Sequence, residues 1–305
     1  MKKTPQVVVI GSLNMDLVVE ADRPPQMGET VQGNQVHFIP GGKGANQAVA
    51  SARLGAKTAM LGAVGGDAFG GELLSALKQE GIDMEAVKTL ADIHTGIASI
   101  VLSQGDNQII FVAGANGQVT PADIDLFEQK IAQADVVLLQ LEIPLETVVY
   151  AAAKAKELGK TVVLNPAPAR VLPDELLRNV DVLIPNESEL YLLAQTGADA
   201  KLEEAMTALL QKGVGTVVTT LGSKGAAYLT AQGESGSVPC HRVTVVDTTG
   251  AGDSFNAGFS YALASGAAVG DAVAFATKVA ALAVTKLGAQ AGMPTLAQVE
   301  EFTAE

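Results

Sequence analysis

The sequence predicts an α/β protein in which a doubly wound, mainly parallel sheet is flanked by helices, with a small antiparallel sheet beside it. Three observations lead to this fold class. Short β-branched runs recur along the chain, segments of helical periodicity separate them, and two further segments have an extended, hairpin-like pattern. Such alternation of strands and helices is typical of right-handed βαβ crossovers on a parallel sheet.

The predicted strands of the main sheet lack the polar alternation of a half-exposed sheet. Continuous apolar runs of this kind are typical of strands that helices cover on both faces. They occupy residues 6–12, 59–65, 134–142, 161–168, 180–187 and 215–222.

Helical periodicity fills much of the chain between and after these strands. No 20–50-residue repeat, low-complexity segment or obvious linker occurs, so residues 1–305 are expected to form one domain. The predicted helices are 43–54, 70–80, 121–133, 145–158, 187–195, 201–212, 251–264 and 268–286.

Two segments, approximately residues 13–40 and 95–114, break the alternation. The second predicts a β-hairpin with its turn at Gly105, Asp106 and Asn107. Because both segments have an extended character, we expect them to form one small sheet set apart from the main one. Such a sheet beside an α/β core is suited to act as a lid or as a surface between subunits.

Composition narrows the classes of function. Apolar residues make up 48% of the 305 positions and charged residues 17%, which supports a sizeable core and argues against disorder. The formal net charge is −13 with no basic cluster, so nucleic acid and anionic membranes are not expected as partners. The single cysteine, Cys240, cannot form an intrachain disulfide, which fits a reducing compartment.

No segment predicts export or membrane insertion. The apolar run near the N-terminus stops after four residues, which is too short for a signal peptide. The most apolar late stretch, AVAFATKVAALAV, contains Lys278 and predicts a buried helix. We therefore expect a cytoplasmic protein.

Polar and glycine residues follow several of the predicted strands. Ligands of open α/β sheets bind beyond the carboxyl ends of the strands, so this set predicts a binding site at that edge. Its members are Gly11, Ser12, Asn14, Asp16, Glu142, Asn165, Asn186, Glu187, Gly222, Ser223, Lys224 and Gly225.

The stretch TTGAGDSFNAG, residues 248–258, places one carboxylate among residues with almost no side chains, where a helix is expected to begin. A helix N-terminus carries unpaired N–H groups and partial positive charge. Small residues leave those groups open to a bound anion. Asp253 is therefore either a cap that fills the anion site itself or a catalytic group beside a bound anion.

The stretch PGGKGANQAVASARLGA, residues 40–56, surrounds Lys43 with glycines and puts Asn46 one turn into a helix. It is not a P-loop, because glycine follows the lysine where Ser or Thr would bind magnesium. The chain also has no G-x-G-x-x-G fingerprint, no G-x-S-x-G elbow and no common zinc spacing. The remaining carboxylates, amides, glycines and lysine suit phosphoryl transfer, which depends on positioning and charge stabilisation.

Together, GGKGANQA at 41–48 and DTTGAGDSFNAG at 247–258 resemble the two signatures of the ribokinase-like, or PfkB, carbohydrate kinases. NESE at 186–189 is similar to the N-x-x-E motif of that family. The resemblance runs from Gly11 to about Pro294. Within the family, it is similar to the members that phosphorylate ribose, through GSLNMD, GGKGAN, LQLE, NPAPAR, PNE, TLGSKG and GAQ in this order.

The resemblance implies that ATP phosphorylates D-ribose at O5, which gives D-ribose 5-phosphate and ADP. Asp253 would be the general base, and the N–H groups of Gly250, Ala251 and Gly252 would form an anion hole. The implied sugar-binding residues are Asn14, Asp16, Gly42, Lys43, Asn46, Glu142 and Asp253. The implied ATP-binding residues are Asn186, Glu189, Thr220, Gly222, Ser223, Gly225, Gly252 and Thr277.

The resemblance also implies two metal ions and a homodimer. Glu189 would help to organise Mg²⁺ through water, and the small sheet would close over the sugar and pair two subunits. Gly292 stands where the family commonly has a serine, which puts the strength of activation by a monovalent cation, expected to be K⁺, in question. The residues that match the ligands of this cation are Asp247, Thr249, Ala283, Lys286, Gly288 and Gly292.

Two other functions stay open at this point. One is a sister kinase for deoxyribose, fructose or a nucleoside, because selectivity depends on placement that the sequence does not give. The other is a sugar-binding regulator that has lost turnover, although such a protein is expected to lose Asp253 or the anion-hole glycines, and this chain retains them. A Rossmann oxidoreductase lacks support without its glycine fingerprint.

Overall fold

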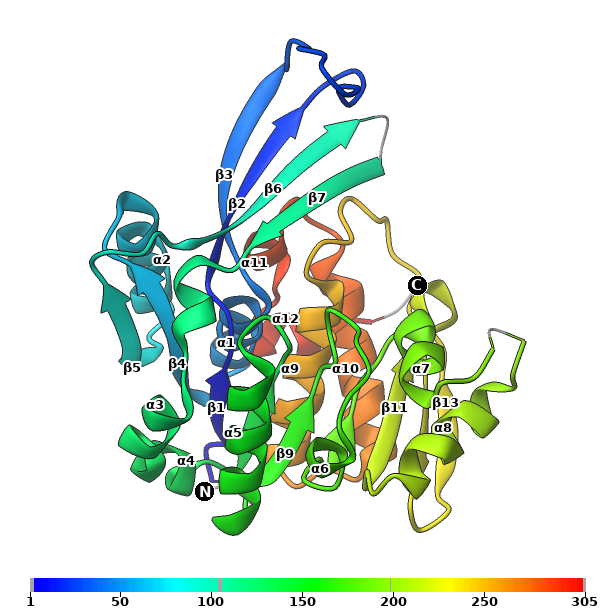
Figure 1. The fold of residues 1–305 in the computed structure, drawn as a ribbon. Coiled ribbons are helices and arrows are strands. Elements are labelled where there is room, and N and C mark those ends of the chain that lie inside the picture. Colours follow the sequence, from blue (N-terminus) through cyan, green and yellow to red (C-terminus); the bar gives the residue numbers. More distant parts are fainter. Residues whose placement is uncertain (1–2, 104–105, 198, 304–305) are drawn as a thin grey trace.

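A computed structural model describes residues 3–103, 106–197 and 199–303. In these ranges the main sheet has nine strands, and all neighbouring pairs are parallel except the last two at one edge. In spatial order (Figure 1) they are β13 (Ser235–Val238), β12 (Ala226–Thr230), β11 (Thr216–Thr220), β10 (Val182–Leu183), β9 (Thr161–Leu164), β8 (Val136–Leu139), β1 (Gln6–Ile10), β4 (Lys57–Gly65) and β5 (Asp83–Leu90).

The six strands predicted for the main sheet are all present, and the mainly parallel order is confirmed. The sequence pattern missed β5, β12 and β13. Strands β5 and β13 form the two edges of the sheet, and their partly exposed polar side chains replace the continuous apolar run of a central strand. Strand β12 follows β11 through a tight turn and pairs antiparallel with it.

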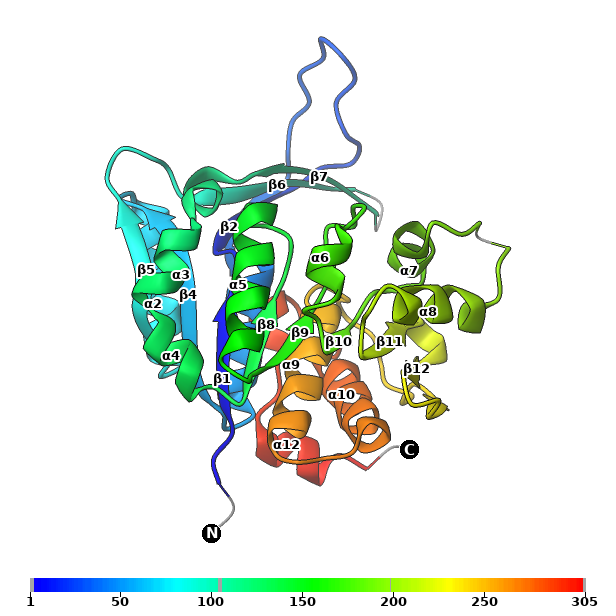
Figure 2. The same ribbon diagram turned by 60° about the horizontal axis from the view of Figure 1, so that its bottom comes forward.

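Helices cover both faces of the main sheet, and each face has its own apolar core. One core includes α1 (Lys43–Arg53), α2 (Ala68–Gln79), α9 (Ala251–Ala264) and α10 (Val269–Ala283). The other includes α3 (Pro121–Leu126), α4 (Glu128–Gln133), α5 (Leu145–Glu157), α6 (Asp174–Leu177), α7 (Glu187–Ala194) and α8 (Leu202–Gln211), as Figure 2 shows from below. Short helices complete the chain: η1 (Gly114–Gln118), η2 (Gly222–Lys224), α11 (Ala289–Gly292) and α12 (Leu296–Glu301).

Two predicted helices differ from the observed ones. The helix expected at 121–133 is divided at Phe127, whose backbone leaves the helical region. The helix expected at 268–286 ends at Ala283, because the carbonyl of Val284 accepts the N–H groups of Val246 and Asp247 from a neighbouring loop. Among the described residues, no helix has both the length and the apolar character needed to cross a membrane.

The two extended segments come together as a second, four-stranded sheet that projects from the main body (Figure 1). We call it the small sheet; its strands in order are β3 (Gln35–Gly41), β2 (Asn14–Glu20), β6 (Gly96–Ser103) and β7 (Asp106–Val112). The outer pairs are antiparallel, whereas the central pair β2–β6 is parallel. The predicted hairpin of β6 and β7 is present, but Asp106 and Asn107 of its expected turn belong to β7 and pair with Ser103 and Leu102. Gly105 lies outside the described residues.

Candidate active site

The candidate site lies at the carboxyl ends of the parallel strands. Ser12, Gln140, Asn165 and Asn186 follow β1, β8, β9 and β10, respectively. Hydrogen bonds and cavity walls join these residues to the first turns of α1 and α9. The polar strand ends that the sequence singled out therefore meet at one edge of the sheet, as the fold class predicts.

Asp253 lies in the first turn of α9, which begins after Gly250 in the left-handed conformation. The residue is 7% exposed, and its carboxylate accepts hydrogen bonds from two side-chain amides of α1. Asn46 Nδ2 donates to Oδ2 and Gln47 Nε2 donates to Oδ1, each at 2.9 Å. Among the described residues no backbone N–H donates to this carboxylate, so Asp253 does not cap its own helix.

Gln47 is a fully buried residue of the site that the sequence analysis did not single out. Besides its bond to Asp253, Nε2 donates to Asn165 Oδ1 at 3.2 Å, and Oε1 accepts from Gln140 Nε2 at 2.6 Å. Because all three contacts need this amide orientation, the network fixes the side chain. The available signal was the amide pair Asn46–Gln47, whose two side chains point to the same carboxylate from successive positions of α1.

Glu142 connects three elements of the expected sugar site. Its Oε2 accepts from Ser12 Oγ at 2.5 Å, from the backbone N–H of Lys43 at 3.1 Å and from Asn14 Nδ2 at 3.5 Å. The Asn14 amide is held on its other side by buried Asn116, whose Nδ2 donates to Asn14 Oδ1 at 2.7 Å. Ser12 and Asn116 therefore hold Glu142 and Asn14, two of the predicted sugar-binding residues, in place.

The turn between β3 and α1 requires glycine. Gly42 has a φ of 88°, and a Cβ there would lie 2.7 Å from the backbone nitrogen of Asn14. At the preceding Gly41, a Cβ would lie 2.4 Å from Asp16 Oδ2, so the Asp16 carboxylate packs directly on the backbone. This close packing brings Asp16, Asn14 and Lys43 to one place.

The site concentrates negative charge around one lysine. Burial, together with Glu142 and Asp253, raises the pKa of Asp16 to about 7 despite the nearby Lys43. Burial alone would lower the pKa of the Lys43 ammonium, but Asp253, Glu142, Glu189 and Asp16 outweigh it and the pKa is raised. Lys43 is therefore charged at neutral pH, and four carboxylates act on its charge.

A cavity of about 140 Å³ adjoins Asp253 and the glycines of α9. Asn186 and Glu189 line it and form the capping box of α7: the N–H of Asn186 donates to Glu189 Oε2 at 2.8 Å, and the N–H of Glu189 donates to Asn186 Oδ1 at 2.9 Å. Burial raises the pKa of Glu189 in spite of this bond and of Lys43. Carboxylate and amide oxygens around a small cavity suit Mg²⁺ that keeps several of its waters.

A larger cleft of about 760 Å³ opens beside the small cavity, and Thr220 and Gly252 line both. Its floor is mainly apolar, with Val243, Val245 and Phe255 among the side chains that sequence reasoning missed. The residues predicted for nucleotide binding that line this cleft are Thr220, Gly222, Ser223, Gly225, Gly252 and Thr277. An apolar cleft that leads to an anion site at a helix N-terminus suits a nucleotide with its phosphates directed inward.

Of the residues predicted to bind a monovalent cation, Asp247 and Thr249 lie in the loop before α9 and Ala283 ends α10. Lys286 and Gly288 lie between α10 and α11, and Gly292 ends α11. Asp247 Oδ1 accepts from the N–H of Thr249 at 2.9 Å and from its hydroxyl at 2.7 Å, and Oδ2 accepts from the N–H of Gly288 at 2.8 Å. Burial raises the pKa of Asp247, but these hydrogen bonds outweigh it, so the pKa is lowered and the carboxylate is charged at neutral pH. The side chain of Lys286 is exposed.

At position 292, where the resemblance implies a serine, this chain has glycine. A Cβ on Gly292 would lie 2.3 Å from the carbonyl oxygen of Ala283, so a serine would not fit on this backbone without a shift. Carboxylate and carbonyl oxygens remain as candidate ligands of the cation, and such oxygens suit K⁺ or Na⁺. Among the described residues no three His, Cys, Asp or Glu side chains gather as a transition-metal site.

Residues 4–296 match the sequence profile of the pfkB family carbohydrate kinases. The ribokinase of Bacillus subtilis is 43% identical over 296 residues, which cover 97% of this chain and 98% of that protein. The ribokinase of Haemophilus influenzae is 42% identical over 307 residues, covering 99% of each. The structure of Arabidopsis thaliana ribokinase complexed with ribose and ATP is 34% identical, with a TM-score of 0.91 over 99% of this chain and all of that one.

Proposed function

Because this chain belongs to the pfkB family of carbohydrate kinases, we propose that it transfers the γ-phosphoryl group of ATP to O5 of D-ribose. The identity with two ribokinases over nearly the whole chain supports the substrate, and the similar structure that holds ribose and ATP supports the pair of ligands. The observation that carries the proposal is the place of Asp253. Its carboxylate lines the small cavity and also bonds Asn46 of the expected sugar site.

In this proposal Asp253 is the general base. It accepts the proton of the O5 hydroxyl as O5 bonds to the γ-phosphorus, while the bond from that phosphorus to the β,γ-bridging oxygen breaks. The two amides of α1 hold the carboxylate from the side, and its remaining lone pairs are available to the sugar. A general base of this kind contributes about 10² to 10⁴ in rate.

The N–H groups of Gly250, Ala251 and Gly252 are proposed to bind the charge on the transferring phosphoryl group. The side chains of these residues are absent or a single methyl, and α9 begins here with no side-chain cap. Gly250 and Gly252 line the cavity, so the helix N-terminus would present their N–H groups and partial positive charge to it, whereas the N–H of Ala251 also donates to the carbonyl oxygen of Thr248 at 3.2 Å. Such preorganised donors stabilise the transition state because they need no reorientation during the reaction.

The sugar is proposed to bind between β2, the loop after β8 and α1, where Glu142 and the Asn14 amide meet. Carboxylates and amides can pair several hydroxyls at once. A site of this kind rejects an analogue that lacks a hydroxyl, because its own polar groups would lose a partner. The proposed contacts are Asn14, Asp16, Gly42, Lys43, Asn46, Glu142 and Asp253.

ATP is proposed to bind in the larger cleft with its phosphates toward the small cavity, and Asn186 and Glu189 to hold the hydrated Mg²⁺. The ion would neutralise phosphate charge when bound. A monovalent cation is proposed at Asp247 with backbone oxygens of the α10–α11 loop, where it would order the loop that leads to Gly250. The proposed contacts of ATP and of the cation are those given in the sequence analysis.

The small sheet is proposed to act as a lid over the sugar and as the contact between two subunits. It carries exposed large apolar side chains on several strands, which is unusual for a surface that stays in water. These are Val36, Phe38, Leu102, Ile109, Ile110, Phe111 and Val112, from 36% to 69% exposed. A closed lid would exclude water and so limit idle hydrolysis of ATP.

The proposal is tested by an ATP-consumption assay with D-ribose, 2-deoxyribose, fructose and adenosine, each in K⁺ and in Na⁺. We expect turnover selective for ribose, higher in K⁺, with ³¹P NMR placing the phosphate on O5. Turnover only on another acceptor would support phosphoryl transfer from ATP but would show that the substrate is not ribose. Binding of ribose without product would contradict the kinase function and favour a sugar-binding regulator.

A further inference from the structure

α11 is a helix of four residues that lies beside α1, α10 and the strand β3. It also packs on the loop before α9, since a Cβ on Gly250 would lie 2.8 Å from the Cβ of Ala289. A helix this short does not hold its place by its own hydrogen bonds. Its position between the sugar-side helix and the anion-binding loop must therefore come from contacts with other elements.

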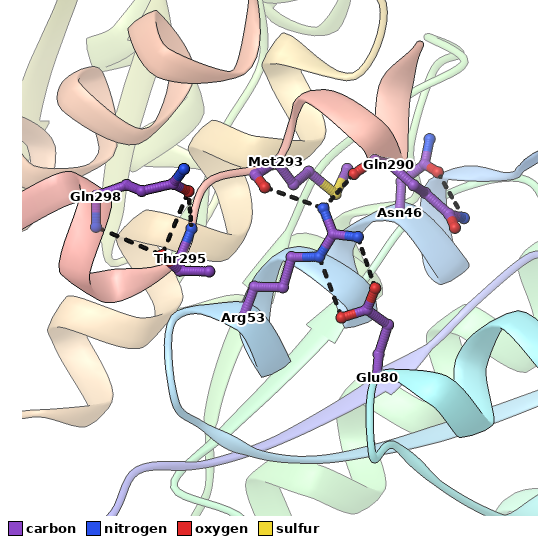
Figure 3. Close-up of polar contacts among 7 residues, drawn as sticks. All are labelled: Asn46, Arg53, Glu80, Gln290, Met293, Thr295 and Gln298. Atoms are coloured by element: carbon purple, nitrogen blue, oxygen red, sulfur yellow. Dashed lines mark hydrogen bonds and ion pairs between the residues drawn. The ribbon is translucent and has the colours of Figure 1, made fainter. Parts of the chain in front are cut away.

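Arg53, the last residue of α1, supplies such contacts (Figure 3). Its Nη1 donates to the carbonyl oxygens of Gln290 at 2.5 Å and Met293 at 3.0 Å. Carbonyls near a helix C-terminus have few N–H partners of their own, and a basic side chain satisfies them. The guanidinium thereby fastens the C-terminal part of α11 to the end of α1.

The other edge of the same guanidinium is held by Glu80, at the end of α2. Arg53 Nε and Nη2 donate to the two carboxylate oxygens at 3.1 and 2.6 Å. The two side chains are 23% and 25% exposed, so the pair is partly shielded from water. The planar fork of arginine can serve the carboxylate and both carbonyls together, which a lysine ammonium cannot do in the same geometry.

Gln290 links α11 to the candidate site. Its Nε2 donates to Asn46 Oδ1 at 3.2 Å, and Asn46 Nδ2 donates to Asp253 Oδ2 at 2.9 Å (Figure 3 shows the first bond). The Asn46 amide thus has a donor at its oxygen and a carboxylate at its nitrogen. Turning the amide over would lose both bonds, so Gln290 reinforces the orientation that Asp253 needs.

We propose that Arg53 and Gln290 are positioning residues for the sugar site: Arg53 fixes α11, and Gln290 of α11 fixes the Asn46 amide. Neither side chain bonds Asp253 directly. The inference rests on the proposed roles of Asn46 and Asp253. It adds Arg53 and Gln290, through which α11 holds the Asn46 amide in place.

The test is a double-mutant cycle with Gln290→Leu, Arg53→Met and the double variant. Gln298→Ala is the matched control: it lies close by, in the capping box of α12, where its Oε1 accepts from the N–H of Thr295 at 2.9 Å. For each variant the ribose dissociation constant is measured by calorimetry, and KM for ribose, KM for ATP and kcat are measured by assay. If the Glu80 carboxylate, left without its partner, prevents Arg53→Met from folding, the double variant Arg53→Met/Glu80→Leu takes its place in the cycle.

We expect Gln290→Leu to weaken ribose binding about tenfold, in keeping with the loss of one hydrogen bond in a shielded site, with KM for ATP unchanged. The double variant should bind ribose no more weakly than Gln290→Leu alone, because Arg53 acts through Gln290. Unchanged ribose binding in Gln290→Leu, multiplying effects in the double variant, or an equal rise in KM for ATP would each overturn the proposal. If the wild type turns over another sugar of the panel, the cycle is run with that sugar, and the same comparisons decide.

Discussion

At the scale of the residue, the site consists of charged groups held by neutral amides. Asp253 is bonded by Asn46 and Gln47, and Glu142 is bonded by Asn14. Buried amides fix a carboxylate without adding a second charge, so the carboxylate can still accept a proton. The same arrangement leaves most of the charge balance to a single cation, Lys43.

The bond from Gln47 to Asp253 predicts a kinetic effect. Gln47→Leu removes one of the two side-chain donors that hold the Asp253 carboxylate, so we expect the base to lose its fixed orientation and kcat to fall, with ribose binding little changed. Activity at pH 7 should fall about 10- to 100-fold. Ser51→Ala on the same helix is the control, since Ser51 donates to the backbone carbonyl of Gln47 and not to the site. A kcat of Gln47→Leu within a fewfold of wild type would contradict the prediction.

The buried carboxyl group of Asp16 predicts that its removal stabilises the fold at high pH. Its pKa, raised from 3.8 to about 7 by burial and by Glu142 and Asp253, means that the native state holds a proton that the unfolded state releases. The contribution of Asp16 to the free energy of unfolding therefore falls as pH rises from about 4 to about 7. We expect Asp16→Asn to be more stable than wild type by roughly 1 to 3 kcal/mol at pH 8, with weaker ribose binding. Urea unfolding at pH 4.5 and pH 8 checks this; a gain that does not shrink at the lower pH would refute it.

The sequence was sufficient to single out Asp253, Lys43 and Asn46, because glycine-rich helix starts mark places where backbone and ligand approach closely. It was not sufficient for Gln47, Asn116 or Gln290. The importance of these amides comes from partners far along the chain; Gln47 and Asp253, for example, are 206 positions apart. Such pairings depend on the packed fold and leave no periodic signal.

At the scale of the element, helix starts and strand ends define the site, and the sequence predicted most of them. The predicted helix 43–54 begins at Lys43 and the predicted helix 251–264 has the same bounds as α9. Elements with a weak apolar pattern escaped prediction: the edge strand β5 has polar side chains, and α11 has only four residues. Their positions are set by neighbours, as the contact of Arg53 with α11 illustrates.

Two glycines that flank α1 allow a matched test of the turn before this helix. Gly42 and Gly55 have φ angles of 88° and 91°, so alanine should cost about 1 to 2 kcal/mol of stability at each. Only at Gly42 would the new Cβ meet backbone, 2.7 Å from Asn14 N, whereas nothing lies within 4 Å at Gly55. We expect Gly42→Ala to lower kcat/KM for ribose about 10²-fold and Gly55→Ala to leave it near wild type. Equal kinetic effects of the two variants would count against the close packing of this turn.

At the scale of the whole molecule, an acidic chain with net charge −13 is proposed to bind an anionic nucleotide. The proposed solution is local: α9 offers N–H groups, Lys43 offers its ammonium, and the cleft beside them is apolar. The small sheet stands apart from this body and exposes apolar side chains. Its predicted role in dimer formation follows from this surface.

The dimer proposal predicts the effect of a single charge on the small sheet. Ile110, in β7, is 69% exposed, and Ile110→Lys should convert a dimer to a monomer and raise KM for ribose. Leu126, in α3, is 74% exposed and provides the control Leu126→Lys, which should remain dimeric. Light scattering coupled to size-exclusion chromatography gives the masses. A monomeric wild type, or loss of the dimer in both variants, would exclude the small sheet as the contact.

The central claim, that Asp253 is the base for phosphoryl transfer to the sugar, is tested most directly by Asp253→Asn. Ribose binding is measured by calorimetry and turnover by single-turnover kinetics with ATP. The account predicts ribose binding within a fewfold of wild type and a rate lowered by about 10² to 10⁴. A rate within tenfold of wild type, with ribose bound, would show that another group takes the proton and would contradict the account.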